Sequence, residues 1–203
     1  GRIGILVIDN YTDFDKFVWD AATLEWYNNP ACGKKFNLRK EPKEGLPPRY
    51  LPGEKGFQTI QSLDYGAGHT AYRKTFERIY RRLTAFADRV LFWAHPKFGI
   101  EPNELGQDVS RSSIEASVKK TNNWLIGQVS GYGVMSRMDG KVYVSFKPAV
   151  QDFQLGSSFE HLSNQNILIS TSKTIEGEGG SSIEVVDEVF WERIYPNYKK
   201  ITK

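Results

Sequence analysis

The chain has 203 residues, of which 39% are apolar, 13% aromatic and 25% charged, and its formal net charge is +3. This composition excludes an intrinsically disordered segment, which would have few aromatic residues and a larger net charge. No apolar run reaches the ~20 residues of a membrane-spanning helix, so no membrane partner is expected. The single cysteine, Cys32, excludes an internal disulfide, and no Cys/His cluster has the spacing of a zinc site.

The charged residues are unevenly distributed along the chain. Residues 1–33 have a net charge of −3, residues 34–97 of +8 and residues 98–203 of −2. A basic segment between two acidic ones suits an anionic partner, and it equally suits a contact between identical subunits of opposite local charge. An uneven, solvated surface explains the pattern as well, because charge asymmetry alone identifies no partner.

The first part of the chain predicts a strand, a helix and a long loop. Arg2–Ile8 is rich in β-branched residues and is expected to form a buried strand. A helix is expected from Asp13 to Tyr27, with Thr12 as its cap and Asp15 at the capping-box spacing. Residues 31–56 contain four prolines, four glycines and ten charged residues, which indicates an extended loop or arm.

The middle of the chain predicts a second helix between two strands. Phe57–Leu63 alternates weakly, as a strand does, and Thr70–Asp88 has an apolar stripe at helical spacing with a basic outer side. Arg89–His95 is expected to be an apolar strand and Phe98–Asp108 a polar loop. A short helix is expected from Ser112 to Thr121, because Ser112 and Glu115 have the spacing of a capping box.

From residue 124 onward apolar and polar residues alternate with a period of two, which is typical of half-buried strands. Asp139-Gly140 predicts a two-residue hairpin, because a type I′ turn needs positive φ at both positions. A looser turn is expected from Gly177 to Ser182. The five expected strands are Trp124–Val129, Tyr132–Met138, Lys141–Lys147, Asn166–Ser172 and Ile183–Trp191.

Together these elements predict one α+β domain over residues 1–203. Its N-terminal half is expected to contain the helices. Its C-terminal half is expected to be an antiparallel β-sandwich or barrel-like structure over residues 124–192.

Two short motifs are typical of ion or cofactor sites, and each has a structural explanation that we favour. Asp9, Asp13 and Asp15 offer carboxylates to a hard cation, but acidic residues at a helix start are expected from the helix dipole. Gly66–Ala71 matches the G-x-G-x-x-A of dinucleotide sites, and a turn with an N-cap explains it; a plain anion site at Thr70 is the alternative. No nucleophile elbow or H-E-x-x-H motif is found, so a role without catalytic residues, cofactor or metal is favoured.

Nucleic-acid binding is supported by the basic loop and the basic helix. Phe36, Tyr50 and Phe57 alternate with cations in and beside the loop and are expected to stack on bases. The cations expected to contact phosphates are Lys34, Lys35, Arg39, Lys40, Arg73, Arg78, Arg81 and Arg82.

A structural role in an assembly is the favoured interpretation. A long arm, segregated charge and β-hairpins that can pair with neighbouring copies are typical of assembly subunits. In Tyr132–Thr174 (YGVMSRMDGKVYVSFKPAVQDFQLGSSFEHLSNQNILISTSKT) an Asp-Gly hairpin is followed by a phenylalanine strand, a proline loop and an Asn-led strand. This order resembles the tail-tube subunits of contractile phages and related injection systems, loosely over residues 70–192. The resemblance implies a ring-forming virion subunit without catalysis.

We therefore expect a protein made in the cytoplasm whose partners are copies of itself or other subunits of an assembly. Residues 31–56 are the expected inter-subunit arm, and strands 141–147 and 183–192 are the expected β interface. The alternative is a nucleic-acid-binding protein that uses the loop 34–55 and the helix 70–88.

Overall fold

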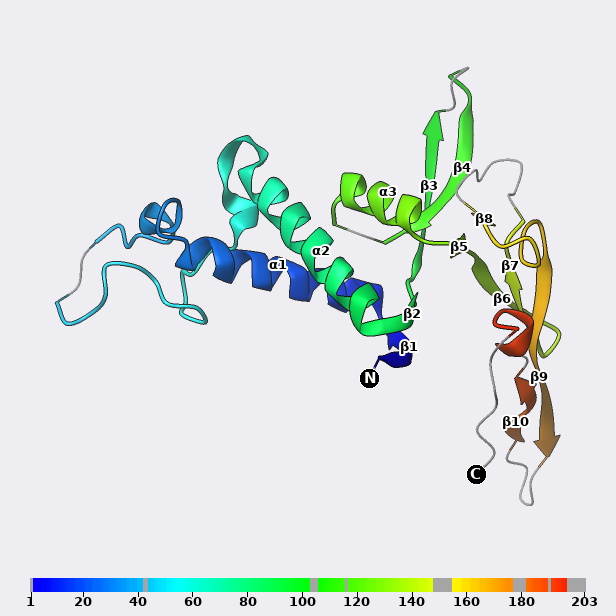
Figure 1. Cartoon of the computed structure of the whole chain (residues 1–203). Helices are drawn as coiled ribbons and strands as arrows, with labels where there is room; N and C mark the ends of the chain where they lie inside the picture. The colour runs from blue at the N-terminus through cyan, green and yellow to red at the C-terminus, as the bar shows by residue number, and fades with distance from the viewer. Residues whose placement is uncertain are drawn as a thin grey trace. The chain divides into compact units, whose positions relative to one another are not determined.

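The chain forms two compact units (Figure 1). The first comprises Gly1–Lys97 and Ile114–Asn123, and the second comprises Phe98–Ser113 and Trp124–Lys203. The structure, a computed structural model, describes residues 2–41, 44–102, 106–115, 117–147, 155–176, 182–189 and 191–196. Its helices and strands confirm a mixed α+β chain.

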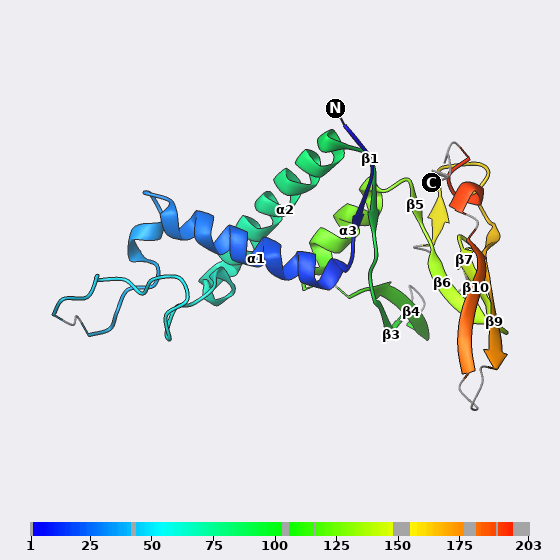
Figure 2. The ribbon, with the colours of Figure 1, turned by 90° about the horizontal axis from the view of Figure 1, so that it is seen from below.

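Two helices and a pair of parallel strands make up most of the first unit. β1 (Ile3–Ile8) leads into α1 (Tyr11–Asn28), and α2 (Ala67–Phe86) leads into β2 (Ala87–Phe92). The strands β1 and β2 pair in parallel, and α1 packs against α2 (Figures 1 and 2). All four elements are confirmed near their predicted positions.

β1 is not the buried strand that the sequence predicts. Ile3 and Val7 are 40% and 48% exposed. β1 and β2 form a sheet of two strands only, so β1 has a single neighbouring strand within the described part of the chain.

The cap of α1 also differs from the predicted one. Asn10, rather than Thr12, is the N-cap, and its Oδ1 accepts a hydrogen bond of 2.9 Å from the backbone N–H of Asp13. Asparagine suits this position because its short side chain reaches the free N–H groups of the first turn. Since the helix begins at Tyr11, Asp15 lies in the second turn, where it is buried.

Aromatic side chains fill the space between α1, α2 and β2. Tyr11 and Phe14 of α1 meet Phe76 of α2 and Phe92 of β2, with ring centroids 5.7 to 6.3 Å apart. The rings are tilted or edge-on, which stabilises aromatic pairs beyond the area that they bury.

A buried carboxylate completes this core. Asp15 is 5% exposed and accepts hydrogen bonds from the Tyr72 hydroxyl and, at 3.2 Å, from the backbone N–H of Ser117. The Ser117 hydroxyl in turn accepts a hydrogen bond of 2.6 Å from Trp19 Nε1, and the Trp19 ring stacks on Tyr72. Burial raises the pKa of Tyr72 above its ordinary value, and the hydrogen bond to Asp15 raises it further.

The segment before α2 is helical rather than the strand predicted over 57–63. Two short 3₁₀ helices, η2 (Ile60–Ser62) and η3 (Asp64–Gly66), precede α2. Gly66 has a φ of +69°, and a Cβ on Gly68 would lie 1.8 Å from the carbonyl oxygen of Ile60. The positive φ therefore explains Gly66 and the close approach to Ile60 explains Gly68, and the described residues just before them form 3₁₀ helices rather than the strand of a dinucleotide site. Thr70 lies inside the helix, where its hydroxyl donates to the Gly66 carbonyl.

The second unit contains a four-stranded antiparallel sheet (Figure 2). Its strands are β6 (Val134–Met138), β7 (Lys141–Ser145), β9 (Asn166–Glu176) and β10 (Ser182–Val189), in the order β10-β9-β7-β6. The short strands β5 (Gly131–Tyr132) and β8 (Gly156–Ser157) form a separate pair. The antiparallel sheet is confirmed, and the described strands form no closed barrel.

The predicted hairpin joins β6 to β7. Asp139 and Gly140 have φ values of +49° and +70°, as a type I′ turn requires. The turn predicted from Gly177 to Ser182 falls on residues 177–181, which lie outside the described residues, and on Ser182 at the start of β10.

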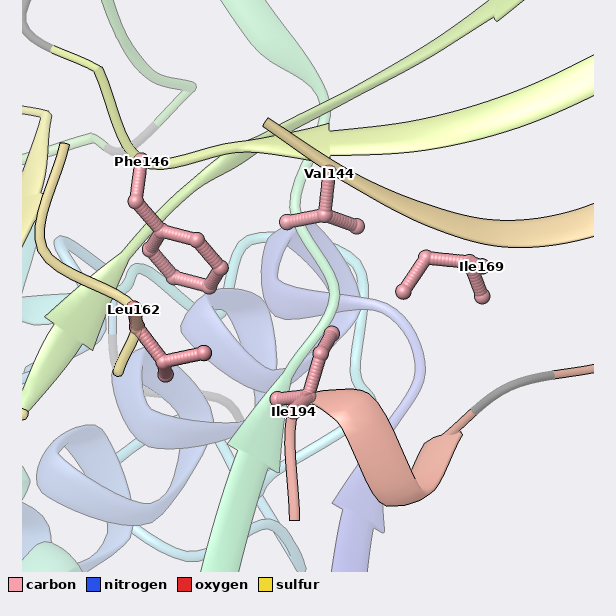
Figure 3. Close-up of a cluster of buried hydrophobic side chains, with 5 residues drawn as sticks. All are labelled: Val144, Phe146, Leu162, Ile169 and Ile194. Atoms are coloured by element: carbon pink, nitrogen blue, oxygen red, sulfur yellow. The ribbon is translucent and has the colours of Figure 1, made fainter. Parts of the chain in front are cut away.

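The core of the second unit lies between this sheet and the segments that follow its strands. The buried side chains that converge in Figure 3 are Val144, Phe146, Leu162, Ile169 and Ile194. Ile194 follows the short helix η4 (Trp191–Arg193), and its carbonyl oxygen lies 3.2 Å from Nε2 of His161.

Residues 96–114 differ from the polar loop predicted over 98–108. They form β3 (Pro96–Pro102) and β4 (Asp108–Ile114), which pair as a two-stranded sheet. Because β4 continues to Ile114, the helix predicted to begin at Ser112 is not formed there.

A helix also replaces the strand predicted over 124–129. It is α3 (Lys119–Gln128), and its buried residues Thr121, Asn122 and Leu125 have helical spacing. Burial of this face overrides the local preference of the apolar residues for a strand. Within the described residues, no helix combines the length and apolarity that crossing a membrane requires.

We predict that Tyr72→Phe lowers the free energy of unfolding by about 1–3 kcal/mol, because it removes a donor from the buried Asp15 carboxylate. The control is Tyr65→Phe, the same change at a fully exposed ring, which should stay within ~0.5 kcal/mol of the unmodified protein. Urea denaturation followed by circular dichroism measures both variants. Equal stability of the two variants would contradict a stabilising Asp15–Tyr72 contact.

We also predict alkaline destabilisation from the same cluster. Burial raises the pKa values of Tyr11 and Tyr72 in the folded chain, whereas the pKa of tyrosine in the unfolded chain is about 10. Above about pH 10 the unfolded chain therefore binds fewer protons than the folded chain, and the free energy of unfolding falls as the pH rises. Urea titrations between about pH 8 and about pH 11 should show this fall, and a smaller one in Tyr72→Phe. An equal fall in both proteins is the contrary result.

Candidate functional site

The loop that follows α1 is tied down at its base. It extends beyond the C-terminal end of α1 in Figure 1. The Arg49 guanidinium donates hydrogen bonds of 2.9 and 3.0 Å to the carbonyl oxygens of Gly33 and Tyr27, and it lies 3.5 Å above the Tyr27 ring. Asn37 and Gln58 exchange hydrogen bonds of 2.9 and 2.6 Å. The predicted arm therefore begins and ends in ordered contacts.

Arg39 is held inside the loop. Its guanidinium pairs with Glu54 and lies 4.4 Å from the centroid of the Tyr50 ring, while Nε donates to the Pro47 carbonyl at 3.0 Å. Only 9% of the Arg39 side chain is exposed. This predicted phosphate contact therefore supports the loop instead.

The aromatic residues predicted to stack on bases already have partners in the chain. Phe36 is 6% exposed and meets Phe57 edge-on, and Phe57 also meets Tyr27. Tyr50 lies against Arg39. These rings stabilise the loop, and base stacking would require them to leave their contacts.

The loop lysines of the predicted set are exposed. Lys34 and Lys35 lie in a short 3₁₀ helix, η1 (Gly33–Lys35), and Lys40 lies in the irregular part that follows. None of them lines the hollow on α2 that three of the predicted helix cations share. That hollow therefore brings together helix cations of the predicted set and none of its loop lysines.

The arginines of α2 differ in their partners. Arg73 pairs with Glu77 at 2.7 Å, and Arg78 pairs with Glu25 of α1. Arg81 and Arg82 are exposed. Two of the four predicted helix cations are therefore already in ion pairs.

An open hollow of about 380 Å³ lies along the outer face of α2. Three predicted cations, Arg78, Arg81 and Arg82, line it together with Lys74, which the predicted set omits. Lys74 could have been found from its spacing, because residues at i, i+4, i+7 and i+8 share one face of a helix. The other lining residues are Glu77 and Ala85.

Two open strand edges in the second unit form another candidate surface. Among the strands described, β6 and β10 each have one neighbour in the sheet, whereas β7 is paired on both sides. Within the predicted interface strand 141–147, β7 is an inner strand whose backbone groups already serve the ladders with β6 and β9, so it offers no free pairing edge. β10, which lies in the predicted interface segment 183–192, is an edge strand among those described. Met135 and Met138 of β6 and Val186 of β10 are 40%, 63% and 56% exposed.

The acidic residues near the start of α1 do not form a metal site. Asp13 binds the N-cap and Lys16, and Asp15 is buried against Tyr72. Asp9 lies beside a hollow of about 280 Å³ at the carboxyl ends of β1 and β2. No group of three or more His, Cys, Asp or Glu side chains able to hold a metal ion is found among the described residues.

We predict that Arg49→Gln destabilises the loop, because it removes two hydrogen bonds to carbonyl oxygens and the contact with the Tyr27 ring. The expected loss in the free energy of unfolding is about 1–3 kcal/mol. Lys40→Gln, at an exposed loop cation, is the matched control and should change stability by less than ~0.5 kcal/mol. Urea denaturation and the rate of chymotryptic cleavage in the loop test both variants, because neither substitution removes a chymotrypsin site. A loop that is cleaved equally fast in both would disprove the role of Arg49.

Comparison of the chain with protein-family models, with curated proteins and with solved structures gives no match. The functional interpretation therefore depends on two surfaces within the described part of the chain. These are the basic hollow on α2 and the open strand edges of β6 and β10.

Proposed function

We propose that the chain is a non-enzymatic structural subunit of a larger protein assembly. In this proposal β6 of one copy pairs with β10 of the next. The observation that carries it is the four-stranded sheet in which β6 and β10 each have only one neighbour among the described strands. Unpaired strand edges expose rows of backbone donors and acceptors and are templates for pairing with another chain.

The direction of the strands favours head-to-tail pairing. All three ladders of the sheet are antiparallel, so β6 and β10 run in opposite directions. When copies related by rotation about an axis along the strands are placed side by side, β6 of one copy is antiparallel to β10 of its neighbour. The alternation then continues across the contact, and a closed ring of copies has no free edge.

The outer edge of β6 lacks the usual protection against pairing. Natural edge strands are often blocked by proline, lysine or inward-pointing charges. The only charged residue of β6 is Arg137, and its guanidinium pairs with Glu184 and donates a hydrogen bond of 2.8 Å to Ser172. Since Ser172 and Glu184 belong to β9 and β10, the charge is drawn across the sheet and away from the edge.

The other structural predictions made from the sequence are also part of this proposal. The barrel-like arrangement would form between copies rather than within one. The loop over 31–56 would be a second contact, because its exposed lysines can meet an acidic segment of a neighbour. The resemblance to tail-tube subunits and a place in a virion are further parts of the same proposal.

Met135→Pro tests the edge directly. Next to a two-residue turn Met138 and Lys141 form a hydrogen-bonded pair, and the pairs then alternate, so the N–H of Met135 faces the open edge. Proline at this position removes an outward donor and leaves the ladder with β7 intact. We expect the unmodified protein to assemble and Met135→Pro to be monomeric in light scattering and in negative-stain images, at low and at high salt.

The matched control is Met135→Ala, which removes the same side chain but keeps the N–H. It should assemble as the unmodified protein does, and circular dichroism should show that both variants are folded. A monomeric Met135→Ala would overturn pairing through the backbone. A monomeric unmodified protein would overturn the proposed function as a whole.

A further inference from the structure

We propose that the hollow on α2 binds the phosphate groups of a nucleic-acid backbone, without reading the base sequence. This inference does not depend on the proposed assembly, since the hollow lies in the first unit and the paired edges lie in the second.

The hollow has a local excess of positive charge. Its lining holds four cations and one carboxylate, Glu77. That carboxylate already pairs with Arg73, which is outside the lining, and Arg78 pairs with Glu25. Lys74, Arg81 and Arg82 have no ion pair among the described residues, so three exposed positive charges share one helix face.

The charges on this face are only partly balanced within the chain. Arg78 lies three or four residues from Lys74, Arg81 and Arg82, and its ion pair with Glu25 offsets the repulsion that this spacing would otherwise cause. Lys74, Arg81 and Arg82 have no such partner among the described residues. A bound polyanion would neutralise these three charges at once.

The spacing and the kind of cation indicate phosphates in a row. Guanidinium groups match the geometry of phosphate oxygens and bind them in a bidentate manner. From Lys74 to Arg82 the helix rises about 12 Å, while duplex DNA carries one negative charge per ~1.7 Å of its axis. The row of cations can therefore meet several phosphates at once, which a single small anion cannot offer.

The residues that line the hollow also indicate that binding does not depend on the base sequence of the nucleic acid. Among the described residues no aromatic side chain lines the hollow, and the loop rings that could stack on bases are engaged with Arg39, Tyr27 and one another. Without stacking or base-edge contacts, recognition is limited to the backbone.

The test measures binding of a fluorescent 20-base-pair DNA duplex by anisotropy over a range of salt concentrations, using the full chain. The variant is the triple substitution Lys74→Gln/Arg81→Gln/Arg82→Gln, because glutamine keeps the helix propensity while it removes the charge. Each lost phosphate contact should reduce the slope of log K against log salt by about 0.9, so the triple variant should lose about 3 units of slope. Its affinity at low salt should fall at least ~10-fold.

The matched control is Lys34→Gln/Lys35→Gln/Lys40→Gln, which changes the net charge equally but leaves the hollow intact. It should bind within ~2-fold of the unmodified protein. Two duplexes of unrelated sequence should bind equally well.

Three results would overturn the proposal: no binding by the unmodified protein, an equal loss in both triple variants, or binding to anionic phospholipid vesicles in place of DNA. The native mass of the α2 variant should equal that of the unmodified protein, which separates a failure of this inference from a failure of the proposed assembly.

Discussion

The buried carboxylate of Asp15 is the constraint on which the first unit depends. A carboxylate in an apolar core is costly unless donors surround it, and its donors here come from α2 and from Ser117, far apart in the chain. The charge can be satisfied only when α1, α2 and the segment 114–123 are all in place. The same contact fixes which side of α2 faces α1, because Tyr72 must point inward.

The orientation of α2 then determines what its other face presents. Tyr72 and Phe76 are buried toward α1 and the aromatic cluster, so residues about half a turn away must be exposed. Those residues include Lys74, Arg78 and Arg81, which line the hollow. The basic surface is thus the necessary counterpart of the buried face, and its position follows from the Asp15–Tyr72 contact.

The sequence predicts features whose cause is local and fails where the cause is distant. The Asp139-Gly140 turn and the stripe of α2 are confirmed because a φ preference or a period of 3.6 residues is sufficient to form them. The strand predicted over 124–129 is wrong because burial of Leu125 and its helical neighbours decides that segment. The charge of Arg39 could not show that Glu54 and Tyr50 enclose it, because these contacts form only on folding. Alternating apolar and polar residues likewise could not show that β7 is an inner strand, because the order of strands depends on long-range pairing.

The net charge of +8 over residues 34–97 therefore overstates what a partner can use. Arg39, Arg73 and Arg78 are in ion pairs and Arg49 is bound to carbonyl oxygens, so only part of the charge is available to an external anion. Under the proposal, the three cations of the hollow that have no ion pair among the described residues would bind phosphate only weakly in a single copy. In an assembly joined edge to edge, each copy would present the same hollow, and the effective concentration of neighbouring sites would raise the affinity for a long polyanion well above that of one site. Strand pairing and phosphate binding, although located in different units, would then reinforce each other.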